Sequence, residues 1–87
     1  MNYSEKYEDS IVRGGKHIYL YDDEDILFGV INFYPDHDRL FSEAQAILLK
    51  PYESKSNDPK FLFMGKDCVE KAIEFLKKKY EEALEEE

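Results

Sequence analysis

Two carboxylates flank an imidazole at Asp36, His37 and Asp38, and these are the residue types of divalent-metal sites and of acid–base catalysis. Consecutive residues in a turn usually point in different directions, so we prefer a polar turn in which Asp36 or Asp38 caps a following helix. The other histidine, His17, could join them only through the fold. We therefore predict neither a metal site nor a bound cofactor.

A lone cysteine and a glycine pair are the next candidates for chemistry. Cys68 falls in the first turn of a predicted helix, where the helix dipole can lower a thiol pKa. No base accompanies it in the sequence, so a small half-buried residue is the preferred interpretation. The segment 13–16 (RGGK) could bind an anion through backbone amides, although a hairpin turn is favoured. With no nucleophile and base pair and no nucleotide-binding motif, the sequence predicts that the chain is not an enzyme.

Acidic residues outnumber basic ones by 20 to 12, which gives a formal net charge of −8. The run from Asp22 to Asp25 lacks the glycine and the terminal glutamate of a calcium-binding loop, so a solvated turn and an acidic docking patch are the alternatives. The polar face of the C-terminal segment has the same two interpretations. If the carboxylates serve binding, we expect the partner to contact Asp22, Asp23, Glu24, Asp25, Asp36, Asp38, Glu81, Glu82 and Glu85.

Length and composition restrict the class of protein. A chain of 87 residues can bury enough surface for only one hydrophobic core, so we expect a single domain over residues 1–87. The negative charge disfavours direct binding to nucleic acid and favours a protein partner with a basic surface. One cysteine, no signal-peptide pattern and no long apolar run predict a cytoplasmic protein that does not span a membrane.

The clearest element is a C-terminal helix. Between Asp67 and Glu87, apolar residues recur at spacings of three and four, which is the pattern of an amphipathic helix. Asp67 and Glu70 have the spacing of a capping box, so the helix is expected to begin there. Its apolar stripe comprises Val69, Ala72, Ile73, Leu76, Tyr80, Ala83 and Leu84.

The remaining elements are predicted to be strands. Residues 10–13 and 16–21 suggest a hairpin joined by a two-residue turn at Gly14 and Gly15, and residues 1–8 a flexible arm or a short helical turn. A long strand over 26–34 ends at Pro35, and a short strand covers 60–64. Residues 38–50 fit both a second helix and a fourth strand, and this choice stays open.

Both faces of the strand over 26–34 are apolar, because Ile26, Phe28 and Val30 alternate with Leu27, Ile31 and Phe33. One helix covers one face of a sheet. If residues 38–50 form a strand, we expect an exposed aromatic face that serves as a dimer or partner interface. We assign to this interface Tyr19, Tyr21, Leu27, Ile31 and Phe33.

These observations predict an α+β domain with an antiparallel meander of four to five strands and the C-terminal helix packed on one face. The function that we expect is that of an acidic protein-binding module, an inhibitor or modulator of a basic nucleic-acid-binding protein. In type, though not in any motif, it resembles the small acidic nucleic-acid mimics of phages and mobile elements. The alternatives are a homodimeric or accessory-subunit domain that uses the aromatic sheet face, and a binder of single-stranded nucleic acid.

Overall fold

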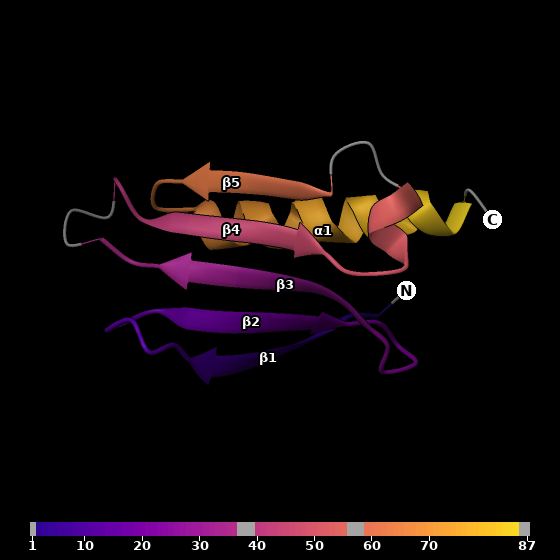
Figure 1. Ribbon diagram of the computed structural model, residues 1–87, viewed down its shortest axis with the longest axis horizontal. Helices are drawn as coiled ribbons and strands as arrows, with labels where there is room; N and C mark the ends of the chain where they lie inside the picture. Colours follow the sequence, from indigo (N-terminus) through magenta and orange to yellow (C-terminus); the bar gives the residue numbers. More distant parts are fainter. Residues whose placement is uncertain (1, 37–39, 56–58, 86–87) are drawn as a thin grey trace.

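The computed structural model describes residues 2–36, 40–55 and 59–85 and has two layers, a five-stranded antiparallel sheet and one helix (Figure 1). The strands follow chain order across the sheet, which confirms the predicted α+β meander with its C-terminal helix. They are β1 (Ser4–Asp9), β2 (Lys16–Tyr21), β3 (Leu27–Tyr34), β4 (Glu43–Leu48) and β5 (Lys60–Met64), followed by α1 (Cys68–Glu85), with a short 3-10 helix η1 (Tyr52–Lys55) before β5.

The N-terminal prediction is wrong, because the first strand is β1 and lies where an arm was expected. Every residue of β1 is exposed, so its sequence shows no apolar alternation that could reveal a strand. Residues 10–15 form a longer loop in place of the predicted strand and two-residue turn. Gly14 has a φ of 76°, and the Gly15 amide donates to the Val12 carbonyl at 2.8 Å.

Residues 43–48 form strand β4, so the alternative of a second helix is wrong. Ala44, Ala46 and Leu48 alternate along the strand, and each is completely buried. Alanine and glutamate favour helix intrinsically, but the period-two burial of these three side chains outweighs that preference. Two alanines also let the helix approach β4 closely.

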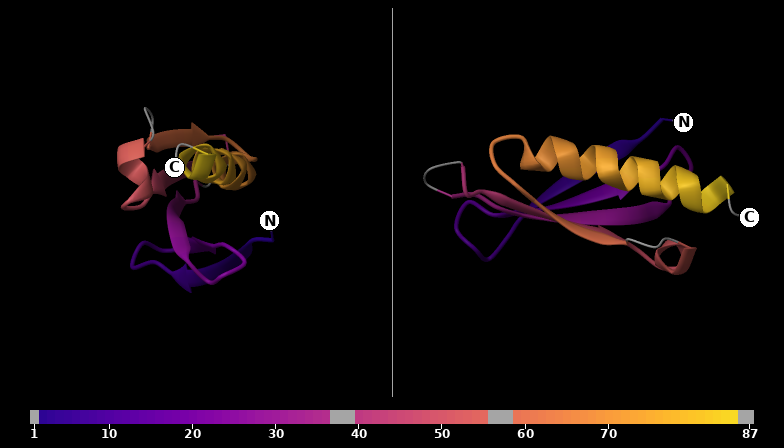
Figure 2. Two further views of the ribbon diagram at one scale, coloured as in Figure 1. Left: turned by 90° about the vertical axis from the view of Figure 1, so that its right-hand side faces the viewer. Right: turned by 90° about the horizontal axis from the view of Figure 1, so that it is seen from above.

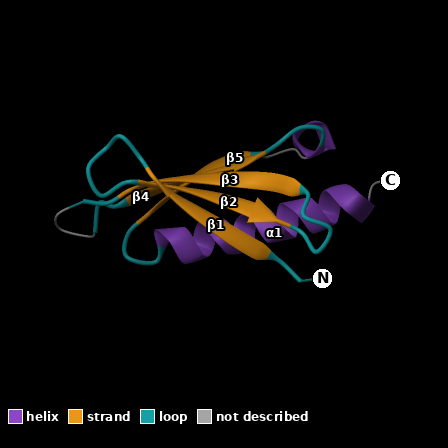
Figure 3. Cartoon of the chain, turned by 90° about the horizontal axis from the view of Figure 1, so that it is seen from below, coloured by secondary structure: helices purple, strands orange, loops and turns teal. Residues whose placement is uncertain are grey.

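Helix α1 lies across one face of the sheet, over β4 and flanked by β3 and β5. Figures 2 and 3 show this arrangement edge-on, with α1 on one side of the sheet only. The helix directs Ala72, Leu76 and Tyr80 into the core, where they meet Ile18, Leu20, Phe28, Ile31, Ala44, Ala46 and Leu48, and Ala83 is also buried. No helix in the described ranges is long and apolar enough to cross a bilayer.

A β-bulge in β3 changes the predicted faces of the sheet. Leu20 pairs with Gly29 while Tyr21 pairs with Leu27, so Phe28 is an extra residue on β3. Phe28 and Gly29 therefore both face the helix: Phe28 stacks on Tyr80 at 4.2 Å, and a Cβ on Gly29 would lie 3.0 Å from Leu76 Cδ1. Each residue after the bulge therefore lies on the face opposite to the one that simple alternation from Leu27 would give it.

Candidate functional site

The β2–β3 turn is built on Asp22, whose side chain is buried. Its Oδ1 accepts hydrogen bonds from the backbone amides of Glu24 and Ile26, each at 2.9 Å. These bonds form an Asx-type turn, and Asp25 adopts a positive φ of 61° within it. Asp22 therefore shapes the turn and is not exposed to a partner, which corrects its predicted role, whereas Asp23, Glu24 and Asp25 are exposed.

The last turns of α1 meet this turn through Tyr80. The Tyr80 hydroxyl donates to Asp22 Oδ2 at 2.6 Å, in a contact buried from solvent. This hydrogen bond, with the two backbone amides, holds the pKa of Asp22 below its usual 3.8. Burial first, and then the Asp22 carboxylate, raises the pKa of Tyr80. The ring of Tyr52 from η1 lies perpendicular to the Tyr80 ring, with the two ring centres 4.8 Å apart.

Tyr3 brings the N-terminus to the same end of the molecule. Its hydroxyl donates to Glu81 Oε1 at 2.8 Å, and its ring meets Phe28 edge-on at 5.5 Å. Burial raises the pKa of Tyr3, and the negative charges of Glu81, Asp22 and Asp23 raise it further. Lys77 Nζ lies 5.2 Å from the centre of the Tyr3 ring, in cation–π geometry.

The structure therefore brings together two acidic segments that are far apart in the sequence, as Figure 1 shows at the end that holds both termini. We call this surface the acidic end and define it by Asp23, Glu24, Asp25, Glu81 and Glu85. Glu85 follows Glu81 by one helical turn and lies on the same face of α1. Glu82 points elsewhere, because it pairs with Lys79 at 3.7 Å, and Lys79 lies over Phe75 on the β5 side.

Asp36 lies at the opposite end of β3 and is not part of the acidic end. Its amide donates to Ser42 Oγ at 2.9 Å, and it borders a groove of about 340 Å³ with Phe33, Pro35, Ser42 and Lys66. His37 and Asp38 fall outside the described residues. His17 lies in β2, where its Nδ1 is 2.8 Å from Asn32 Oδ1. Among residues 2–36, 40–55 and 59–85, no three His, Cys, Asp or Glu side chains are grouped to hold a metal ion.

The sheet face opposite α1, which we call the open face, is the second candidate surface. Tyr19, Tyr21 and Leu27 lie on it, and each is half-buried. Ile31 and Phe33 do not: Ile31 is completely buried beneath α1, and Phe33 packs against the same core. The bulge at Phe28 is the cause, because a single extra residue moves the residues beyond it to the other face. The open face also carries Val30, Tyr34 and Ile47, which the sequence analysis did not assign to it.

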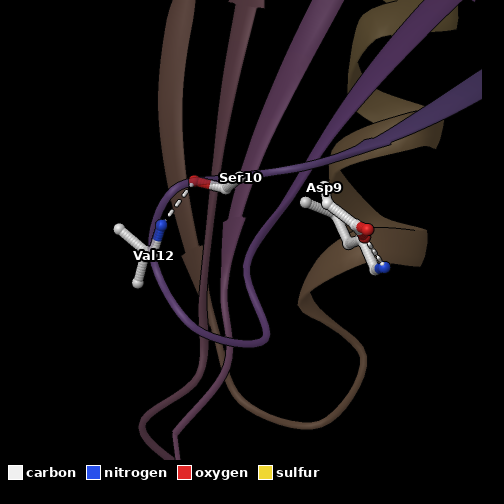
Figure 4. A network of polar contacts seen from close by, with 4 residues as sticks. Asp9, Ser10 and Val12 are labelled. Atoms are coloured by element: carbon white, nitrogen blue, oxygen red, sulfur yellow. Dashed lines mark hydrogen bonds and ion pairs between the residues drawn. The ribbon is translucent and has the colours of Figure 1, made fainter.

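Cys68 and the β1–β2 loop have structural roles. Cys68 is buried at the start of α1, and this burial raises the pKa of its thiol, which is opposite to the activation of a nucleophile. In the loop, Ser10 Oγ accepts the Val12 amide at 3.1 Å, and Lys16 forms an ion pair with Asp9 (Figure 4). The Gly15 amide and the Lys16 ammonium, two groups that an anion would use, are thus engaged within the hairpin.

Sequence reasoning missed Tyr3 and Tyr80, the residues that assemble the acidic end. A signal for Tyr80 was present, since a tyrosine on the apolar stripe of a helix must find a partner for its hydroxyl. No comparable signal marks Tyr3. No protein-family model matches the chain, and comparison with curated proteins and with solved structures gives no match either.

Proposed function

We propose that this chain is a non-enzymatic, cytoplasmic protein-binding module that offers the acidic end to a basic surface on another protein, such as the nucleic-acid-binding surface of a protein that it inhibits or modulates. The observation that carries the proposal is the meeting of the β2–β3 turn with the end of α1. The Tyr80–Asp22 and Tyr3–Glu81 hydrogen bonds hold the two segments together.

The arrangement of charge suits such a partner. Three exposed carboxylates in the turn and two on the helix occupy one end of the molecule, and they reside on elements anchored to the core. Fixed carboxylates can take the place of phosphates before lysine and arginine side chains, and they need less ordering when they bind than a flexible acidic tail does. A concentrated negative potential also speeds the encounter with a basic protein, and this effect weakens as salt is added.

The test compares two triple variants that have the same net charge. Asp23→Asn/Asp25→Asn/Glu85→Gln neutralises the acidic end, whereas Glu8→Gln/Glu43→Gln/Glu70→Gln removes as many charges toward the opposite end of the molecule. Binding of each variant to a panel of purified basic nucleic-acid-binding proteins and to a labelled oligoarginine peptide is measured by fluorescence anisotropy. We expect the first variant to lose about tenfold in affinity for its protein partner and the second about twofold or less. Equal losses in the two variants, or binding that is insensitive to salt, would contradict the proposal.

The open face supports a second candidate function, that of a homodimeric or accessory-subunit domain. Tyr19, Tyr21, Leu27, Val30 and Ile47 share this face, and no helix in the described part of the chain covers it. Its test is the substitution Val30→Lys, followed by light scattering. Loss of self-association or of a copurifying subunit would support this function, and an unchanged assembly state would argue against it.

A further inference from the structure

The two edges of the sheet differ in a way that matters for assembly. Strand β1 forms one edge and carries Glu5, Lys6, Glu8 and Asp9, and charged residues of this kind discourage pairing with another strand. Strand β5 forms the other edge, and four of its five residues are apolar. The side chains of Phe61, Leu62 and Met64 are 47%, 48% and 48% exposed. Lys60 is the one charged residue of β5, so this edge is protected less than β1 is.

The outer backbone groups of β5 can be identified from its pairing with β4. The Leu48 amide donates to the Pro59 carbonyl at 2.8 Å, and the Gly65 amide donates to the Ser42 carbonyl at 2.9 Å. Because hydrogen-bonded positions alternate in an antiparallel pair, Phe61 and Phe63 also bond toward β4. The N–H and C=O groups of Lys60, Leu62 and Met64 therefore point away from the sheet.

An aromatic groove lies beside this edge on the helix side. Phe61, Phe63 and Phe75 form a cluster with ring centres 4.8 to 5.6 Å apart. Phe63 of β5 and Phe75 of α1 border a groove of about 590 Å³, which is otherwise lined by Asp67 and by charged residues on the outer face of α1. A strand added to β5 would place alternate side chains in this groove.

The charged residues that line this groove indicate which molecule would bind beside β5. If a second copy of the helix runs antiparallel beside the first, Asp67 lies opposite Lys78 and Lys71 lies opposite Glu74. Each of these residues then faces the opposite charge. All four residues line the groove, and all four are exposed. These four residues are complementary to an antiparallel copy of themselves, as a two-fold interface requires, whereas Glu70, which also lines the groove, lies opposite the uncharged Phe75.

We propose that two copies of this chain pair through β5, antiparallel about a two-fold axis near Leu62, to form one continuous ten-stranded sheet. Leu62 then exchanges both backbone hydrogen bonds with its counterpart, and Lys60 pairs with Met64 of the second copy, so every outward group of β5 is used. Both helices lie on the same side of the joined sheet. Their axes are about 14 Å apart, three strand spacings, which long Lys and Glu side chains can bridge above the paired phenylalanines.

This interface is independent of the acidic end and of the open face. The acidic ends of the two copies lie at opposite corners of the joined sheet, so either surface can fail its test without affecting the other. A foreign extended peptide could also pair with β5, but the charge pattern on α1 favours a second copy, and the experiment separates these outcomes.

The experiment is a charge exchange on α1, read by sedimentation equilibrium across a concentration series. We expect the wild type to reach twice the 10.3 kDa mass of the chain. Lys71→Glu and Glu74→Lys each place like charges opposite one another and should weaken the dimer by about tenfold, while the double variant should restore it. Lys6→Glu on β1 makes the same change in net charge as Lys71→Glu and serves as the matched control for that variant.

Amide hydrogen exchange provides a second measurement on the unmodified protein. The amides of Lys60, Leu62 and Met64 face solvent in the monomer, so their exchange should slow about tenfold or more as the concentration rises and the dimer forms. Three results would overturn the proposal: a monomer at every concentration, a dimer that the single exchanges leave intact, or a dimer in which these amides exchange as freely as in the monomer. Pairing of β5 with a foreign peptide by a chain that stays monomeric alone would also overturn it.

Discussion

The hydroxyl of Tyr80 and the carboxylate of Asp22 form a buried hydrogen bond of 2.6 Å between residues 58 positions apart. This bond joins the last turns of α1 to the β2–β3 turn. Asp22 is 6% exposed and forms no ion pair with any other residue that the structure describes. Its charge is held by hydrogen bonds alone, from Tyr80 and from two backbone amides. The bond thus fixes both the core and the geometry of the acidic end.

Tyr80→Phe is expected to lower the free energy of unfolding by about 1.5 to 3 kcal/mol, because it leaves one oxygen of a buried carboxylate without its donor. The ring would keep its stacking on Phe28. Urea unfolding monitored by circular dichroism measures the loss. Tyr7→Phe is the matched control, since the Tyr7 hydroxyl donates to Glu5 at 2.6 Å on an exposed surface. Its effect should stay within about 0.5 kcal/mol, and equal losses in the two variants would refute the importance of burial.

The depressed pKa of Asp22 predicts a loss of stability in acid. In the unfolded chain this carboxyl titrates near 3.8, and in the folded protein it titrates lower. Its contribution to stability is therefore complete above the unfolded value and is lost as the pH falls through the folded pKa. Asp22→Asn should flatten the dependence of stability on pH below about pH 4, as measured by urea unfolding between pH 2 and 6. If stability falls as steeply in acid in Asp22→Asn as in the wild type, then other carboxyl groups cause the loss of stability.

Gly29→Ala tests the close approach of α1 to β3. A Cβ at this position would lie 3.0 Å from Leu76 Cδ1 and 3.5 Å from the Ile47 carbonyl oxygen. We expect a loss of about 1 to 3 kcal/mol from overpacking. Adding Leu76→Val removes the methyl group nearest the clash, so the double variant should be more stable than the sum of the single losses predicts. Additive losses of stability would show that Gly29→Ala does not destabilise the protein through its contact with Leu76.

The fold class could be predicted from local patterns because its two strongest signals are local. The stripe of α1 runs through five buried residues with helical spacing, and β3 is long and rich in β-branched and aromatic residues. Strand β1 gave no signal because it is an edge strand exposed on both faces. An apolar pattern reveals a strand only where one of its faces is buried, and neither face of β1 is buried.

The faces of β3 could not be predicted because one bulged residue inverts them. Nothing in the run around Phe28 and Gly29 specifies which residue is extra, and the choice follows from packing against Tyr80 and Leu76. The acidic end is a tertiary feature for the same reason. Local sequence identifies the acidic turn and the acidic helix face, but only the contacts of Tyr3 and Tyr80 bring them together.

Titration of Tyr3 tests directly whether negative charge converges at the acidic end. Burial raises the pKa of Tyr3 first, and the Glu81 carboxylate then raises it by accepting a hydrogen bond from the hydroxyl and by its negative charge. Glu81→Gln removes that charge and should lower the Tyr3 pKa toward its ordinary value of 10.0, as followed for each ring by NMR of Cζ-labelled tyrosine. Tyr7, whose pKa is raised to about 12 by its own bond to Glu5, should be unaffected and serves as the internal control.

The same shift has a consequence at high pH. A phenol whose folded pKa lies above its unfolded pKa stabilises the fold below the unfolded value, and this contribution is lost as the pH rises through the folded pKa. Wild-type stability should therefore fall above about pH 10, and in Tyr3→Phe the decline should be smaller. If Glu81→Gln leaves the Tyr3 titration unchanged, then the helix end and the N-terminal strand are not in contact in solution, and the acidic end is not assembled as the structure shows it.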